Sequence, residues 1–155
     1  MTAALFWLES TSMAKTISGS LSLTASFSAA HLLGYTLILS GALVMHLRLV
    51  GAVLRGTVVR DVTRPAGYLI AVGLALSIVT GSVLFAGRAT SIAANGLFQT
   101  KMSVLLIAAA WQLGVHYRLA RATSQSKQSA SVLGFVGLAL WLGLAVTACA
   151  FILLE

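Results

Sequence analysis

The chain has 155 residues, of which 59% are hydrophobic and only 8% charged, whereas soluble domains carry roughly 25% charged residues. A soluble protein of this size leaves a large share of its surface in water, so it could not cover this much apolar area. Disordered chains are polar and rich in charge, which excludes disorder as well. The composition therefore predicts a protein whose solvent is the lipid bilayer.

Ten basic residues face three acidic ones. The bases lie between the apolar stretches rather than together, a distribution that favours membrane topology over nucleic-acid binding. The single cysteine, Cys149, excludes a disulfide within the chain and any CxxC redox or metal motif. We expect this cysteine to pack between helices as a small apolar residue.

The chain begins with a segment, residues 3–20, that mixes large apolar side chains such as Phe6 and Trp7 with Glu9 and Lys15. This pattern predicts an amphipathic helix at the membrane interface. Four apolar stretches follow at about 23–47, 66–86, 100–117 and 132–154, and each is close to the length of about 20 residues that a bilayer requires. The sequence thus predicts one all-α domain over residues 1–155, a bundle of four transmembrane helices with an interfacial helix before it.

Two connecting segments refine this expectation. Pro65 stands just before the second stretch, where a first-turn proline suits the start of a helix. Residues 123–131 are rich in Ser, Thr and Gln and predict a solvated turn.

The distribution of bases between the two sets of loops predicts the orientation. The loops after the first and third stretches carry seven bases, and the opposite side carries three. Because Lys and Arg collect on the cytoplasmic side, we expect both termini to face outward and the first and third spans to run inward; in a bacterial inner membrane this orientation makes both termini periplasmic. The seven are Arg48, Arg55, Arg60, Arg64, Arg118, Arg121 and Lys127, and the three are Lys15, Arg88 and Lys101.

Ionisable residues inside a span mark functional sites by default, and here they are His31, His46, Lys101 and His116. Fifteen residues separate His31 from His46, and fifteen separate Lys101 from His116. That interval rises about 22 Å along a helix and returns to nearly the same face. The spacing therefore sets His31 opposite Lys101 and His46 opposite His116, an arrangement that predicts axial ligands for one or two haem groups. For His46, Lys101 and His116 taken singly, snorkelling to the headgroups or a hydrogen bond to another helix is the plainer interpretation. His31 is harder to explain in this way, because it lies about 12 Å into the hydrocarbon.

Small and aromatic residues in the spans have two interpretations. The glycines of the spans predict either close helix packing or room for a flat cofactor; they are Gly34, Gly41, Gly73, Gly81, Gly134, Gly137 and Gly143. Tyr35, Tyr68 and Trp111 are candidates for a haem pocket, and packing or interface anchoring explains them equally well.

Other chemistries find less support in the sequence. It contains no HExxH motif, no carboxylate pair inside a span and no Cys/His cluster, which argues against zinc, di-iron and acid–base catalysis by paired carboxylates. An ion transporter would usually carry an intramembrane Asp or Glu. Met45, Met102 and the histidines leave copper transport open, although they form no Met-rich run.

Two stretches carry a family resemblance. They are Ala30-His-Leu-Leu-Gly-Tyr, continuing to His46-Leu-Arg-Leu-Val-Gly, and Ser91-Ile-Ala-Ala-Asn-Gly-Leu-Phe-Gln-Thr-Lys-Met. They resemble an uncharacterised family of bacterial four-helix membrane proteins over nearly the whole chain. More remotely, they are similar to HemJ-type protoporphyrinogen oxidases and the membrane part of CopD-type copper-resistance proteins. The resemblance to the HemJ type implies haem b binding by His31 and Lys101. The four-helix family often has an acid where this chain has His46.

Residues and resemblance together predict a membrane-embedded b-type cytochrome that transfers electrons and is not a stand-alone enzyme. We expect it to serve a larger redox complex or protein partner in the lipid bilayer. A porphyrin-oxidising enzyme of the HemJ type and a haem-free accessory subunit are the alternatives.

Overall fold

The computed structural model describes residues 2–121 and 127–154. Every regular element in these residues is a helix, and they contain no strand. The predicted all-α class is confirmed. Seven helices follow one another in these residues: α1 (Thr2–Ser10), α2 (Ser12–Ser18), α3 (Leu21–Val50), α4 (Val59–Ala86), α5 (Ala89–Ala94), α6 (Gly96–Arg121) and α7 (Lys127–Leu154).

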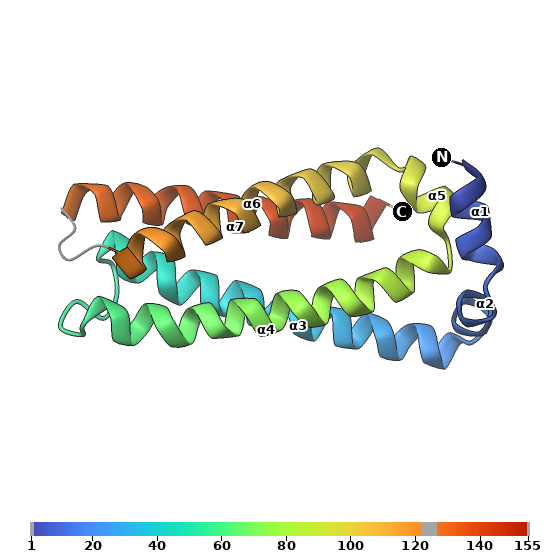
Figure 1. Ribbon diagram of the computed structural model, residues 1–155, viewed down its shortest axis with the longest axis horizontal. Helices are drawn as coiled ribbons and strands as arrows, with labels where there is room; N and C mark the ends of the chain where they lie inside the picture. The colour runs from blue at the N-terminus through green and yellow to red at the C-terminus, as the bar shows by residue number, and fades with distance from the viewer. Residues whose placement is uncertain (1, 122–126, 155) are drawn as a thin grey trace.

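The four long helices form a bundle of two layers, with α3 and α4 in one layer and α6 and α7 in the other (Figure 1). α3 packs against both α4 and α7, and α6 packs against α7. Successive long helices reverse direction, so α3 and α6 run the same way and both chain termini lie at one end. We call that end, where α1, α2 and α5 lie, the capped end; the opposite one, where residues 51–58 join α3 to α4, is the loop end.

Three of the long helices, α3, α4 and α7, are long and apolar enough to cross a membrane. They indicate a membrane protein. The fourth, α6, has 26 residues but places Lys101, Gln112 and His116 among its apolar positions. These polar side chains lower its hydropathy, so length and composition alone do not make α6 a candidate span.

The long helices extend beyond the apolar stretches that predicted them. The sequence predicts Pro65 in the first turn of the second long helix. In the structure α4 begins at Val59, so Pro65 lies inside it. Hydropathy marks only the part of a helix that faces lipid, whereas the helix itself continues through the basic segment before it. Pro65 is the seventh residue of α4, so it removes one i→i−4 hydrogen bond and its ring crowds the carbonyl of residue 61. The predicted turn at 123–131 is partly helical, because α7 starts at Lys127; residues 123–126 lie outside the described residues.

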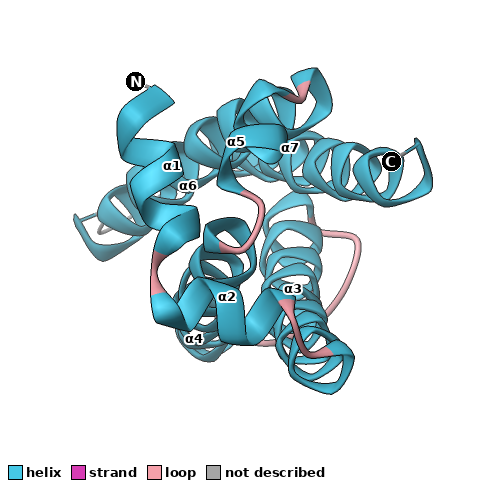
Figure 2. Cartoon of the chain, turned by 90° about the vertical axis from the view of Figure 1, so that its right-hand side faces the viewer, coloured by secondary structure: helices cyan, strands magenta, loops and turns pink. Residues whose placement is uncertain are grey.

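Three short helices lie across the capped end of the bundle (Figure 2). Residues 3–20, predicted to form one interfacial helix, form two helices, α1 and α2. They are separated at Thr11, whose hydroxyl caps α2 by accepting from the Ala14 N–H at 3.3 Å. α5 was not predicted. The Thr90 hydroxyl and backbone N–H, both at 2.7 Å, donate to the Glu9 carboxylate and thereby tie α1 to α5. These two hydrogen bonds hold the pKa of Glu9 below its usual range.

Glycines bring α3 and α4 into close contact. A Cβ at Gly73 would lie 2.5 Å from the Gly34 carbonyl oxygen, and one at Gly34 would lie 2.9 Å from the Gly73 carbonyl oxygen. Gly41 faces the Ala66 carbonyl oxygen in the same way, at 2.6 Å. At these three positions the interpretation as close helix packing is confirmed. Gly143 differs, because a Cβ there would meet no atom within 4 Å.

The best-packed part of the bundle lies toward the loop end. Its buried side chains come from all four long helices: Ala42, Met45, His46, Leu49, Ala66, Ile70, Ala108, Gln112, Val115, Leu133 and Trp141. Toward the capped end, the side chains of His31, Tyr35, Phe98, Lys101 and Phe151 are only half-buried. The two predicted levels of the site therefore lie in differently packed surroundings.

Candidate functional site

His31 lies on the face of α3 that meets α4. Its Nδ1 is 3.0 Å from the Ser77 carbonyl oxygen and 3.2 Å from the Thr80 hydroxyl oxygen. A carbonyl can only accept, so Nδ1 carries the proton and Nε2 carries the free lone pair. A Cβ at Gly81 would lie 2.9 Å from the ring, so the glycine gives the imidazole its space. The ring is held in one orientation by α4.

Lys101 lies toward the same end of the bundle, at the start of α6. Its Nζ lies 5.6 Å from the centre of the Phe151 ring, a distance at which an ammonium is attracted to an aromatic face. Phe98 stacks on Phe85 at 5.4 Å and meets Phe151 at 6.1 Å. Lys101 is thus a cation beside an aromatic group that joins α4, α6 and α7.

His46 and His116 are joined by one side chain that the sequence analysis did not single out, Gln112. The Nε2 of His46 lies 3.1 Å from the Gln112 Oε1, and the Gln112 Nε2 lies 3.3 Å from the Nδ1 of His116. Trp141 donates its indole N–H to the same amide oxygen at 3.3 Å, and the Gln112 amide donates to the Met45 sulfur at 3.0 Å. One amide thereby links side chains of α3, α6 and α7.

These bonds determine the protonation of both rings. The amide oxygen only accepts, so the Nε2 of His46 carries its proton, while the amide nitrogen donates and the Nδ1 of His116 accepts. The Nδ1 of His46 is left buried without a partner among the described residues. A Cβ at Gly137 would overlap the His46 ring, and one at Gly67 would overlap His116. His46 is fully buried and His116 is exposed.

The two levels differ in how well they suit a haem. At the capped end, His31 offers a fixed imidazole whose Nε2 has a free lone pair and makes no hydrogen bond within the described chain. At the loop end, Gln112 occupies the space between His46 and His116 and bonds to both. A porphyrin between those rings would have to displace this amide and the buried Trp141. His31 thus offers a nitrogen that a haem iron would use, whereas the residues between His46 and His116 do not fit a haem.

Other residues that the sequence suggested have varied positions. The Tyr35 hydroxyl is buried without a partner among the described residues. Trp111 donates to the Leu133 carbonyl oxygen at 3.4 Å, whereas Tyr68 is 71% exposed. Cys149 is exposed, so the expectation that it packs between helices is wrong. A span that is apolar on every side does not reveal which of its faces turns inward.

Gln112 and Trp141 are not ionisable, so a pattern of ionisable residues does not reveal them. The i, i+4 spacing of Gln112 and His116 on one helix was the available signal, since such pairs are neighbours on a helix surface. Ser77 and Thr80 had no comparable signal, because their contact with His31 depends on how α4 is rotated.

In the described ranges, no three His, Cys, Asp or Glu side chains gather as metal ligands. The chain matches no protein-family model, no curated protein and no solved structure.

Proposed function

We propose that the chain is a b-type cytochrome of the bacterial inner membrane, which binds one haem b near the capped end with His31 as an iron ligand. The observation that carries the proposal is the His31 ring. Its Nδ1 is fixed by the Ser77 carbonyl and the Thr80 hydroxyl, and metal-binding histidines are commonly oriented by such a second hydrogen bond. Haem bound there would supply one-electron chemistry, while α4 holds the imidazole in place.

The proposal includes a bilayer crossed by all four long helices, α6 among them. At 26 residues, α6 is about 39 Å long, which is enough for a bilayer core of about 30 Å. Its outward positions are apolar, with Leu106, Ile107 and Leu113 exposed by 67%, 57% and 72%. Gln112 instead bonds inside the bundle. The polar residues that lower the hydropathy of α6 are thus partly accounted for by internal contacts. With seven bases near the loop end, that end faces the cytoplasm.

For Lys101 we propose a role as a cation rather than as a second iron ligand. An amine binds iron only when it is deprotonated, whereas the position of Nζ over the Phe151 ring favours the ammonium form. A cation near His31 is suited to a haem propionate. Arginine would keep this charge but cannot bind iron through a lone pair, so Lys101→Arg separates the two roles.

The proposal is tested by the visible spectrum of the purified protein, first oxidised and then reduced with dithionite. We expect a Soret band, with sharp α and β bands on reduction, and one haem per chain. His31→Ala should abolish these bands, whereas His116→Ala, which alters an exposed histidine at the loop end, should keep them. A protein without a Soret band after expression with ample haem would overturn the proposal.

Two further variants examine how the protein holds the ligand. Thr80→Val removes the hydroxyl that contacts His31 Nδ1 but leaves the Ser77 carbonyl. We expect haem to be retained with a shifted midpoint potential, because the hydrogen bond to Nδ1 sets the basicity of the ligand. Lys101→Arg should keep the spectrum of the native protein. A changed spectrum in Lys101→Arg would make Lys101 an iron ligand.

A specific observation also favours a second candidate, a haem-free accessory subunit. Each histidine already has a polar partner and faces a glycine on a neighbouring helix. Such contacts can fix helix packing by themselves. Under this candidate His31→Ala would lower stability and no preparation would contain haem.

The electron-transfer partner required by the first candidate would dock at the capped end, which is the end nearest His31.

A further inference from the structure

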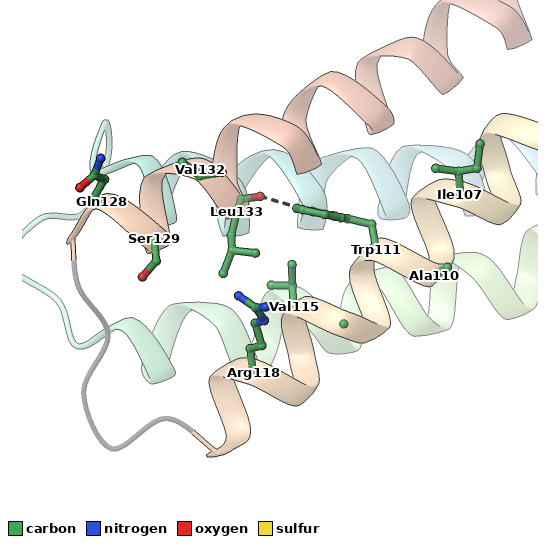
Figure 3. A pocket seen from close by; sticks show the side chains of 10 residues that line it. Ile107, Ala110, Trp111, Val115, Arg118, Gln128, Ser129, Val132 and Leu133 are labelled. Carbon is green, nitrogen blue, oxygen red and sulfur yellow. Dashed lines mark hydrogen bonds between the residues drawn. The ribbon is translucent and has the colours of Figure 1, made fainter.

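A groove lies between α6 and the start of α7 at the loop end, on the outside of the bundle (Figure 3). Its volume is about 850 Å³, within the range of sites that hold small molecules. Ile107, Ala110, Trp111, Val132 and Leu133 provide apolar walls. The hydrogen bond from the Trp111 indole to the Leu133 carbonyl, 3.4 Å long, ties the two walls together.

The groove changes from apolar to cationic along its length. Arg118 borders it at the loop end, and its side chain extends from α6 into the space beside α7 (Figure 3). Eleven residues separate Ile107 from Arg118, which corresponds to about 16 Å of helix. This is close to the thickness of one leaflet of hydrocarbon, about 15 Å. With Ile107 57% and Val132 56% exposed, the apolar part opens toward lipid while Arg118 reaches headgroup level.

Arg118 brings a positive charge to the groove. No acidic residue pairs with it within the described ranges, and the segments at the loop end carry seven bases but one acid, Asp61. The whole chain has three acids, and Glu9 is engaged at the opposite end. A second copy of the chain would therefore bring little negative charge to this groove.

We propose that the groove binds one anionic phospholipid from the leaflet at the loop end. An acyl chain lies along the apolar walls, and the phosphate accepts hydrogen bonds from the Arg118 guanidinium, whose planar fork suits phosphate oxygens. A zwitterionic lipid brings its own cation toward the surrounding bases and binds less well. This lipid site lies at the loop end, away from His31, so the proposal does not depend on haem binding.

The test is native mass spectrometry of the purified full chain, released from detergent micelles after titration with phosphatidylglycerol or with phosphatidylcholine of the same acyl chains. We expect one tightly bound phosphatidylglycerol and weaker binding of phosphatidylcholine. Arg118→Gln should weaken phosphatidylglycerol by about tenfold or more, the effect of losing a charge-assisted hydrogen bond. Arg60→Gln, which removes an exposed base of α4 outside the groove, should have little effect.

Gly114→Leu tests the apolar part of the same site. Gly114 borders the groove, and a Cβ there would meet no atom within 4 Å, so a leucine fills the groove without displacing the core. We expect it to remove both lipids. Gly143→Leu is the matched control, because Gly143 also has open space around it but lies on α7 away from the groove.

Two outcomes would overturn the proposal. One is equal binding of phosphatidylglycerol by Arg118→Gln and Arg60→Gln, or by Gly114→Leu and Gly143→Leu. The other is that inorganic phosphate displaces phosphatidylglycerol and binds equally well to Gly114→Leu and to the native chain. Arg118 would then be a site for free anions.

Discussion

The contact between Gly34 and Gly73 predicts how the α3–α4 pair responds to a single methyl group. In Gly73→Ala the new Cβ would lie 2.5 Å from the Gly34 carbonyl oxygen and 2.8 Å from the Ile38 nitrogen, whereas ordinary contacts begin at 3.4 Å. The shortfall is about 0.9 Å, and the atoms concerned belong to the backbone. No side-chain rotation can relieve it, so the two helices must move apart.

The expected change in the free energy of unfolding follows from two opposing effects. Overpacking a close contact costs about 1–3 kcal/mol, while replacing a helical glycine with alanine gains about 0.5–1 kcal/mol. Gly143→Ala has the second effect only, since a Cβ there meets nothing within 4 Å. We therefore expect Gly73→Ala to be less stable than Gly143→Ala by about 1–3 kcal/mol, because the gain in helix propensity cancels between them.

The two variants can be compared by titrating the protein in mixed micelles with sodium dodecyl sulfate and following helix content by circular dichroism. Separation of α3 from α4 should also lengthen the hydrogen bond from His31 to Ser77, which lies one turn beyond Gly73 on α4. Equal unfolding midpoints for Gly73→Ala and Gly143→Ala would refute the reasoning, because the steric shortfall would then have no energetic consequence.

Three further predictions concern the ends and the centre of the bundle. Because its folded-state pKa is lowered, Glu9 should stabilise the contact between α1 and α5 above its ordinary pKa of about 4.3 and lose this effect as the pH falls through the lowered value. Amide hydrogen exchange of α5 should therefore be slower in the native chain than in Glu9→Gln at neutral pH, and the two exchange rates should become equal in acid. Gln112→Leu leaves the buried N–H of His46 without an acceptor, so we expect a loss of about 1–3 kcal/mol in the same micelle titration; unchanged stability would contradict the described cluster. A periplasm-active reporter should be active when fused after Glu155 and silent within residues 125–128, and the reverse result would invert the orientation.

The helical class and the order of the long helices could be predicted because lipid imposes a minimum length on every apolar span. The ends of the helices could not be predicted in the same way. α4 continues through the basic residues before Pro65, where the side chains are polar and hydropathy gives no signal of a helix. The separation of α1 from α2 at Thr11 depends on a local cap, and the apolar pattern of residues 3–20 does not reveal it.

The candidate site was predictable only as far as it depends on single helices. The fifteen-residue spacing predicts His31 opposite Lys101 and His46 opposite His116. In the structure the Gln112 amide bonds to both His46 and His116, and no hydrogen bond joins His31 to Lys101 among the described residues. The partners of His31 come from α4, and contacts between helices depend on their rotation about their own axes. For apolar helices that rotation is set by packing, which a hydropathy pattern does not encode.

The side chains that α7 contributes at each level determine what the fifteen-residue spacing on α3 and α6 can do. At the loop end, α7 contributes Trp141, whose indole shares the Gln112 oxygen with His46, and Gly137, which lets the His46 ring come close. These contacts close the level around one amide. At the capped end, α7 contributes Phe151 beside the Lys101 cation, and no side chain links that cation to His31 by a hydrogen bond in the described chain. The same interval on α3 and α6 thus gives a closed polar cluster at one level and a fixed imidazole with a free nitrogen at the other, which is why we propose one haem and not two.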